Sequence, residues 1–299
     1  MKQPISLRSI SHSLSGLYSE ERVLFGLGLL GIGLGIIGLI VMAANGRIIL
    51  PQGDIFKPVS FSAAVGIYVL TITLFIPFAG FSIHGRRWWR RGAVALGLYA
   101  LGIENIQTYR GVDPRFARTG FLVDDIAKNI FGYVALGLIV MFLILAWRFF
   151  SKRHTIKNEL LLLGIRYACI TVICAFAAGL WMLANKGARI GATGNLLPLH
   201  AAGFHGLQAV PLVALLLSWS HVPLEISRRW VHTAGLAWLG AMAVMAWQTA
   251  MGRSVLEPSC MVLLVSLLMF VWLLCAVRAV ISCGCDGLQR YLARSRASA

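Results

Sequence analysis

The stretch RVLFGLGLLGIGLGIIGLIVMAAN, residues 22–45, decides the fold class, because it is charged only at its first position. About 20 apolar residues, rising about 1.5 Å each, cross a hydrocarbon layer of about 30 Å. The stretch is too long for the apolar core of a secretory signal, and no small-residue cleavage site precedes the next polar loop. We therefore predict a retained membrane-spanning helix, in which Gly31, Gly35 and Gly38 favour close packing against a neighbour.

The rest of the chain has the same apolar character. Of its 299 residues, 58% are hydrophobic and only 13% are charged, and the mean hydropathy is +0.78. This leaves too little polar surface to cover a water-soluble protein of this size. The sequence predicts an all-α membrane protein of about eight transmembrane helices, each about 20 residues long. They are expected near residues 23–45, 60–83, 92–110, 127–148, 160–184, 198–220, 230–251 and 258–281.

The basic residues divide unevenly between the two sets of loops. The richer set holds Lys2, Arg8, Arg22, Arg86, Arg87, Arg90, Arg91, Arg148, Lys152, Arg153, Lys157, Arg228, Arg229, Arg278, Arg290, Arg294 and Arg296. The poorer set holds Arg47, Lys57, Arg110, Arg115, Arg118, Lys128, Lys186, Arg189 and Arg253. Under the positive-inside rule both termini are cytoplasmic. The net charge of +16 then indicates topology and attraction for anionic lipids at the cytoplasmic loops, and no nucleic-acid partner is expected.

Three segments recur in the same order, about 141 residues apart. Met42-Ala43-Ala44-Asn45 returns as Met182-Leu183-Ala184-Asn185, Arg86-Arg87-Trp88 as Arg228-Arg229-Trp230, and Gln107-Thr108-x-x-Gly111 as Gln248-Thr249-x-x-Gly252. We predict two tandem four-helix repeats, 23–148 and 160–281, joined by a cytoplasmic linker, 149–159. A cytoplasmic segment, 1–22, and a basic tail, 282–299, flank them. Because four is even, both repeats enter the membrane in the same direction and are parallel.

Polar residues gather at the outward ends of the predicted spans. They are Asn45, Glu104, Gln107, Arg110, Asn185, Gln248 and, at the start of the sixth span, His200, His205 and Gln208. An unpaired amide or charge in hydrocarbon costs several kcal/mol, so these groups should face the bundle interior and bind each other or a ligand. They form our candidate site for ligand binding or proton relay.

Helical spacing orders the candidates. Glu104 and Gln107 are three residues apart and share a face. His200 and His205 are five apart, about 140° around a helix, so one unbroken helix cannot aim both at one small ion. With Pro198 in the first turn, His200 lies at the mouth and His205 about 7.5 Å deeper. We expect His205 and Glu104 to be the metal ligands, if a metal is bound.

The residues favour three functions. The first is an outward pocket that binds a metal, haem or quinone-like group in a redox or membrane-enzyme role, since imidazole and carboxylate both coordinate and both change protonation. The second is transport of a small solute or protons, and the third is a structural subunit or assembly factor whose polar layer only joins helices. For Glu104 the structural alternative is an ion pair with Arg110 or a neutral, protonated acid. The sequence leaves open whether the protein is an enzyme, and it lacks the Gly-x-Ser-x-Gly, His-Glu-x-x-His and phosphate-loop motifs.

The segment HAAGFHGLQAVPL, residues 200–212, and QTYRGV, residues 107–112, resemble a family of bacterial integral membrane proteins, as do Lys57-Pro58 and Gly66-Ile67-Tyr68. The resemblance implies a bacterial inner membrane protein and supplies no activity. It departs after Gly111, where the family has a Ser-His pair and this chain has Asp113-Pro114-Arg115-Phe116. Eight spans in two parallel halves also resemble the architecture of haem A synthase, without its histidine pattern.

Overall fold

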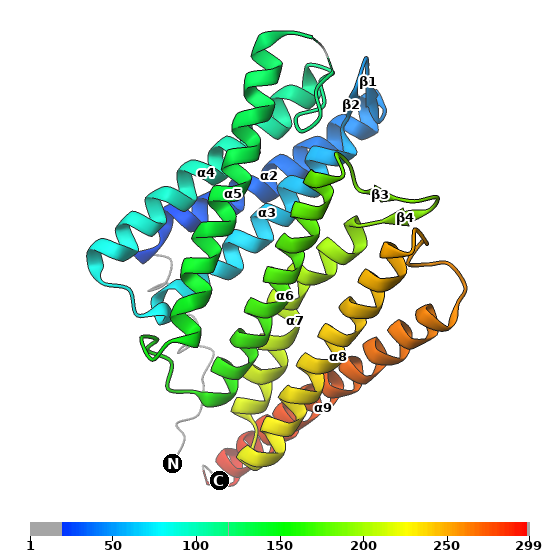
Figure 1. Cartoon of the computed structure of the whole chain (residues 1–299). Helices are drawn as coiled ribbons and strands as arrows, with labels where there is room; N and C mark the ends of the chain where they lie inside the picture. Colours follow the sequence, from blue (N-terminus) through cyan, green and yellow to red (C-terminus); the bar gives the residue numbers. More distant parts are fainter. Residues whose placement is uncertain (1–19, 119, 298–299) are drawn as a thin grey trace. The chain divides into compact units, whose positions relative to one another are not determined.

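The computed structural model describes the backbone of residues 20–118 and 120–297, and side chains as far as residue 284. Most of the predicted segment 1–22, and the side chains of the predicted basic tail beyond 284, therefore lie outside the described residues. The described part forms eight long helices, α2 to α9, and two short antiparallel hairpins (Figure 1). The chain divides into two compact units, Met1–Thr155 and Ile156–Ala299. The boundary between these two ranges falls within the predicted linker.

Unit 1 begins with α2 (Arg22–Asn45), followed by a hairpin of β1 (Ile48–Ile49) and β2 (Gly53–Asp54). Next come α3 (Phe56–Phe75), a 3₁₀ turn η1 (Ile76–Ala79), α4 (Ile83–Tyr109) and α5 (Leu122–Phe150). Helices α2 and α3 pack closely, as the glycines predicted. A Cβ added to Gly31 would lie 2.8 Å from the Cα of Gly66, so only glycine allows this approach.

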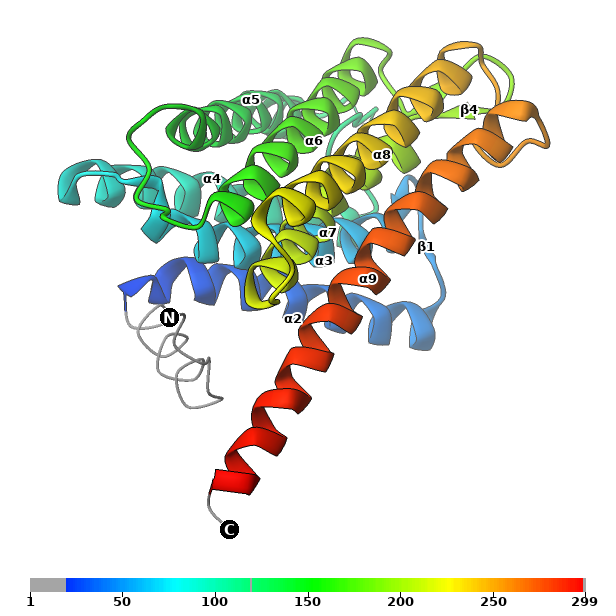
Figure 2. The ribbon, with the colours of Figure 1, turned by 90° about the horizontal axis from the view of Figure 1, so that it is seen from below.

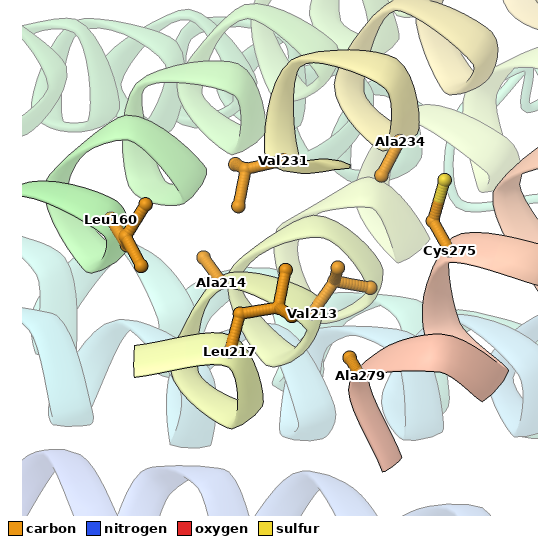
Figure 3. Packing of buried hydrophobic residues seen from close by; sticks show 8 residues of the cluster. All are labelled: Leu160, Val213, Ala214, Leu217, Val231, Ala234, Cys275 and Ala279. Atoms are coloured by element: carbon orange, nitrogen blue, oxygen red, sulfur yellow. The ribbon is translucent and has the colours of Figure 1, made fainter. Parts of the chain in front are cut away.

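Unit 2 consists of α6 (Glu159–Ala184), a hairpin of β3 (Arg189–Ile190) and β4 (Gly194–Asn195), α7 (Leu197–Trp219), α8 (Leu224–Ala250) and α9 (Cys260–Ala297). Helix α9 packs along α8 and also contacts α7 (Figure 2). All four helices contribute to a buried apolar cluster (Figure 3). Its members are Leu160, Val213, Ala214, Leu217, Val231, Ala234, Cys275 and Ala279.

Six of the described helices are long and apolar enough to cross a membrane: α2, α3 with η1, α5, α6, α7 and α9 up to Gly284. Their outward faces are apolar as well, with Leu263 71% exposed and Phe270 54% exposed on α9. A water-soluble protein does not expose such faces, whereas lipid covers them. The prediction of an all-α, multi-pass membrane protein is therefore confirmed.

Several helices begin earlier than the predicted spans. Helix α4 starts at Ile83 and not near residue 92, so its arginine-rich first turns are helical. Ser82 caps them, because its side-chain oxygen accepts from the Gly85 N–H at 3.1 Å. Helix α8 likewise starts at Leu224, before the predicted residue 230. Arginine is a good helix former, so the charged residues before an apolar run extend the helix without extending its apolar part.

The two units share an order of elements: helix, two-stranded hairpin, then three helices, with η1 as an addition in unit 1. Ile48 pairs with Asp54 in the first hairpin, and Arg189 pairs with Asn195 in the second. In unit 1 the Gln52 N–H donates to the Gly111 carbonyl at 2.8 Å. In unit 2 the Thr193 N–H donates to the Gly252 carbonyl at 3.0 Å. In each unit, therefore, the hairpin is held to the loop that follows the third helix (Figure 1).

Candidate functional site

In unit 1 the candidate residues lie at the end of α4, beneath the loop that leads to α5. The loop turns at Gly111, whose φ is +75°, and the Val112 N–H returns to the Gln107 carbonyl at 2.9 Å. A Cβ at Gly111 would lie 2.1 Å from the Leu50 carbonyl oxygen, so the hairpin and the loop meet here backbone to backbone. This turn directs residues 113–118 back over the end of α4.

Glu104 is fully buried, and Arg115 from the returning loop holds both of its carboxylate oxygens. The Arg115 Nη2 lies 2.8 Å from Oε1 and Nε lies 3.1 Å from Oε2, a bidentate pair. The guanidinium also lies 5.0 Å from the Phe61 ring centroid and 5.8 Å from that of Phe131. The structural alternative for Glu104 was thus right in kind but wrong in partner, because Arg115 forms the pair and Arg110 does not.

Arg110 instead joins a second buried group. Its Nη1 donates to Asp124 Oδ1 at 2.8 Å and to the Gln107 side-chain oxygen. The Gln107 Nε2 donates to the same Asp124 oxygen at 3.0 Å. Since Gln107 is 2% exposed and Asp124 is 1% exposed, this network satisfies polar groups that water does not reach.

Asp113 fastens the loop to α3. Its Oδ2 lies 2.6 Å from Lys57 Nζ, and its Oδ1 accepts from the backbone N–H groups of Arg115 and Phe116, both at 2.9 Å. Partial burial acts to raise the pKa of the Asp113 carboxyl, but these hydrogen bonds and the Lys57 charge outweigh it, so the pKa lies below its usual value.

We call these residues the loop charge cluster: Lys57, Glu104, Gln107, Arg110, Asp113, Arg115 and Asp124. Each of its carboxylates has a cationic partner within the cluster. Chemically this arrangement holds a loop in one position, because every member of the cluster is engaged by another. Sequence reasoning did not include Lys57, Asp113, Arg115 and Asp124 in the candidate site. The signal for Arg115 was the buried Glu104 itself, since a buried carboxylate needs a guanidinium within the reach of a short loop.

At the equivalent place in unit 2, the described residues make different contacts. Gln248 is 1% exposed and its Nε2 donates to the Ser254 carbonyl at 2.5 Å, so it binds loop backbone where Gln107 binds a carboxylate. Three residues before Gln248 stands Met245, whereas Glu104 stands three residues before Gln107. An exposed pair remains in the loop, Arg253 with Glu257 at 2.7 Å.

Among the candidate residues of unit 2, His200 lies in the first turn of α7, with Pro198 beside it as expected. Its Nδ1 lies 2.7 Å from the Ala175 carbonyl oxygen on α6. A carbonyl oxygen only accepts, so Nδ1 carries the proton, and in the neutral ring Nε2 is the nitrogen with the lone pair. The ring packs edge to face on Phe204, 4.9 Å between centroids, and a Cβ at Gly179 would come within 3.1 Å of it.

The other candidates are more exposed. His205, Asn45 and Asn185 are exposed and Gln208 is half-buried. Asn185 Nδ2 donates to the Arg189 carbonyl at 2.6 Å, which braces the second hairpin. The expectation that the polar groups turn inward holds for Glu104, Gln107 and Gln248. It does not hold for His205, Asn45 and Asn185, nor for Arg110, which is also exposed.

Glu104 belongs to unit 1 and His205 to unit 2. Among the described residues, no three or more His, Cys, Asp or Glu side chains come together as a metal ion would require. The pairing of His205 with Glu104 as metal ligands therefore stays a prediction.

The fold and the site define a multi-pass helical membrane protein with a charge-paired loop over one of its two units. Comparison with known proteins adds no relative to this description. No protein-family model matches the chain, and searches of curated proteins and of solved structures return no match. The resemblance to the bacterial membrane protein family stays a prediction based on the segments that carry it.

Proposed function

We propose that the chain is a bacterial inner membrane protein with eight spans, built as two tandem parallel four-helix repeats with both termini in the cytoplasm. The shared order of elements supports the duplication, and so do the matching bonds from Gln52 to Gly111 and from Thr193 to Gly252. The concentration of arginine and lysine on one set of loops supports the orientation. Those loops also attract anionic lipid headgroups, by about 1 kcal/mol per charge.

The proposal makes α4 and α8 spans, although they are less apolar than the other six helices. Each has 27 residues, which at about 1.5 Å per residue gives about 40 Å, more than the hydrocarbon thickness of about 30 Å. Their charged residues lie near the helix ends: Arg86 to Arg91 and Glu104 in α4, and Glu225 to Arg229 in α8. In that position a charge reaches the membrane surface or a partner.

For the activity, we propose that unit 2 binds a haem or quinone-like ring through His200, in a redox or membrane-enzyme role. The observation that carries this proposal is the hydrogen bond from Nδ1 to the Ala175 carbonyl. Histidines that bind metals almost always donate their other ring N–H to a carbonyl or carboxylate, which fixes the tautomer and the ring plane. The same arrangement makes Nε2 an acceptor for a quinol hydroxyl.

The chain's own contribution to such a site is positioning. Ala175 orients the imidazole, Phe204 packs on its edge, and Gly179 leaves room for the ring against α6. A bound haem or quinone would supply the electron transfer, and His200 would hold it at the outward end of α7. His205 lies five residues further along α7, about 140° around the helix, and so on another face. His205→Ala is therefore the matched control for His200→Ala.

The test is an absorption spectrum of the detergent-purified protein, with metal analysis and extraction of bound quinone. We expect one haem or quinone per chain, lost in His200→Ala and retained in His205→Ala. Melting curves of both variants check that each still folds. A folded His200→Ala protein that keeps its ligand, or a wild-type protein without haem or quinone, would reject the proposal.

A second candidate, a structural role, is favoured for unit 1 by the loop charge cluster. Each carboxylate of the cluster forms an ion pair with an arginine or lysine of the same unit. Such internal pairing is expected of a network whose only role is to hold the helices and the loop together. Replacement of Glu104 would then lower stability without changing any bound ligand. A spectrum that changes in Glu104→Gln while the melting temperature does not would contradict this role.

A further inference from the structure

A groove lies at the end of α5 in unit 1, away from the loop charge cluster. Its wall is formed by Val140, Leu143, Ile144 and Trp147, which follow one another at i, i+3, i+4 and i+7 and so form one stripe along the helix. The groove encloses about 410 Å³ and is completed by Phe81, Arg148 and Arg153. It thus combines an apolar wall with two guanidinium groups at one end.

The apolar stripe faces outward. Val140 is 51% exposed, Leu143 is 43% exposed and Trp147 is 67% exposed. Helix α5 is one of the helices long and apolar enough to cross a membrane, so hydrocarbon covers this stripe. Trp147 stands at the charged end of the stripe, the position that tryptophan favours at a membrane surface.

The charge of the two arginines is not neutralised inside the protein. Arg148 donates from Nε to the Ala79 carbonyl at 2.9 Å and from Nη2 to the Gly80 carbonyl, and its guanidinium lies 4.9 Å from the Phe81 ring centroid. These contacts fix its position, but carbonyl groups carry no net charge. Within the part of the chain that the structure describes, neither Arg148 nor Arg153 has a carboxylate partner.

Other arginines of unit 1 provide a contrast. Arg86 and Arg90 are held by Glu21, whose side chain is fully buried, at 2.5 Å and 3.3 Å. Those two arginines therefore have a counter-charge within unit 1. The groove at the end of α5 has positive charge beside an apolar wall and no acidic residue in its lining.

We propose that this groove binds one anionic phospholipid, with the phosphate at Arg148 and Arg153 and an acyl chain along the α5 stripe. Guanidinium and phosphate form charge-assisted hydrogen bonds, and the stripe offers contact only to an apolar chain. A soluble phosphate would use the arginines alone, whereas a phospholipid uses both parts. Lipid binding at this groove requires only that α5 crosses the membrane. That the groove lies in the cytoplasmic leaflet rests on the orientation proposed above.

The test is native mass spectrometry of the full chain in a non-ionic detergent, titrated with phosphatidylglycerol or phosphatidylcholine. We expect one phosphatidylglycerol to be retained in preference to phosphatidylcholine, and Arg153→Gln to weaken its retention about tenfold, the scale of one charge-assisted contact. The matched control is Lys152→Gln, because Lys152 is the adjacent exposed cation and does not line the groove. Equal retention of the two lipids, or equal retention in Arg153→Gln and wild type, would overturn the proposal.

A second comparison tests the acyl-chain part. Leu143→Ser keeps both arginines, and we expect it to weaken phosphatidylglycerol retention while leaving the folded state intact, since Leu143 is already exposed. Displacement of the lipid by millimolar glycerol 3-phosphate would show that the phosphate alone is recognised and would overturn the lipid assignment. The absorption spectrum of the His200 variants does not depend on this groove, so the two proposals fail separately.

Discussion

The loop from α4 to α5 and the loop from α8 to α9 are anchored by the same backbone bonds and differ in nearly every side chain that fills them. Val112 bonds back to Gln107 at 2.9 Å in the first, and Arg253 bonds back to Gln248 at 3.2 Å in the second. Only the first contains a buried ion pair, Glu104 with Arg115. The backbone frame is thus independent of the charges, and the loop charge cluster is an addition that only one unit carries.

The two units therefore differ in what their polar groups contact. In unit 1 the buried polar groups bond to one another and close the end of the bundle. In unit 2 the corresponding end has Met245 in place of a buried acid, and an oriented imidazole, His200, stands at the start of α7. The proposals above accordingly give the first loop a structural role and the second unit a ligand-binding role, and the following variants test the structural role.

The largest effect is expected from Arg115→Met. Removal of the guanidinium leaves Glu104 as a buried carboxylate without its partner, which typically destabilises a protein by about 3–5 kcal/mol. The wild-type pair is partly screened because Arg115 is 32% exposed, so we expect a loss near the lower end, about 3 kcal/mol. Thermal or chemical unfolding in detergent measures it.

Leu256→Met, in the second loop, is the matched control, because Leu256 is 82% exposed and should change little. The double variant Glu104→Met with Arg115→Leu makes the first loop resemble the second, which has Met245 and Leu256. We expect it to regain most of the lost stability, since no unpaired buried charge remains at these two positions. A double variant as unstable as Arg115→Met would show that the ion pair is not the source of the loss.

A smaller difference is expected between the two turn glycines. Gly111 and Gly252 have φ of +75° and +74°, where alanine costs about 1–2 kcal/mol. At Gly111 an added Cβ also meets the Leu50 carbonyl oxygen at 2.1 Å, whereas at Gly252 the nearest atom lies 3.2 Å away. Gly111→Ala should therefore destabilise the protein more than Gly252→Ala. Equal melting temperatures for the two variants would show that the first hairpin moves aside without cost.

The smallest effect concerns pH. The pKa of the Asp113 carboxyl is lowered in the folded protein, against its burial, by Lys57 and two backbone N–H groups. Stability from this carboxylate is therefore fully present above its unfolded pKa of about 3.9 and is lost as the pH falls below that value. Unfolding measured from pH 7 to pH 3 should be less pH-dependent in Asp113→Asn. Glu257→Gln, at a partly exposed acid whose lowered pKa comes first from its hydrogen bond with Arg253, should flatten the curve less. The reverse order would contradict the assignment.

Much of the fold could be predicted from the sequence. Runs such as residues 22–45 must be lipid-embedded helices, because no other structure satisfies the backbone of an apolar segment of that length. The burial of Glu104 and Gln107 followed from the cost of exposing them to hydrocarbon. The early starts of α4 and α8 were not predicted, because the apolar pattern shows where an apolar run begins and does not show the charged helical turns before it.

The partners of the buried groups could not be predicted. Arg110 is nearer to Glu104 in the chain than Arg115, and the sequence alone favoured it as the partner. The structure pairs Glu104 with Arg115 because the turn at Gly111 sends the loop back over the end of α4, while Arg110 turns to Asp124 on α5. The hydrogen bond of His200 likewise depends on which turn of α6 lies beside it.

The sequence by itself determined that this chain lies in a membrane as long helices and that a few costly polar groups are buried near the helix ends. These properties follow from composition and from the length of each apolar run, both of which are local. The tertiary structure alone decided which charge meets which. An ion pair forms over about 3 Å, and the path of a loop over such a distance is set by the turn, the hairpin and the helix packed beneath it.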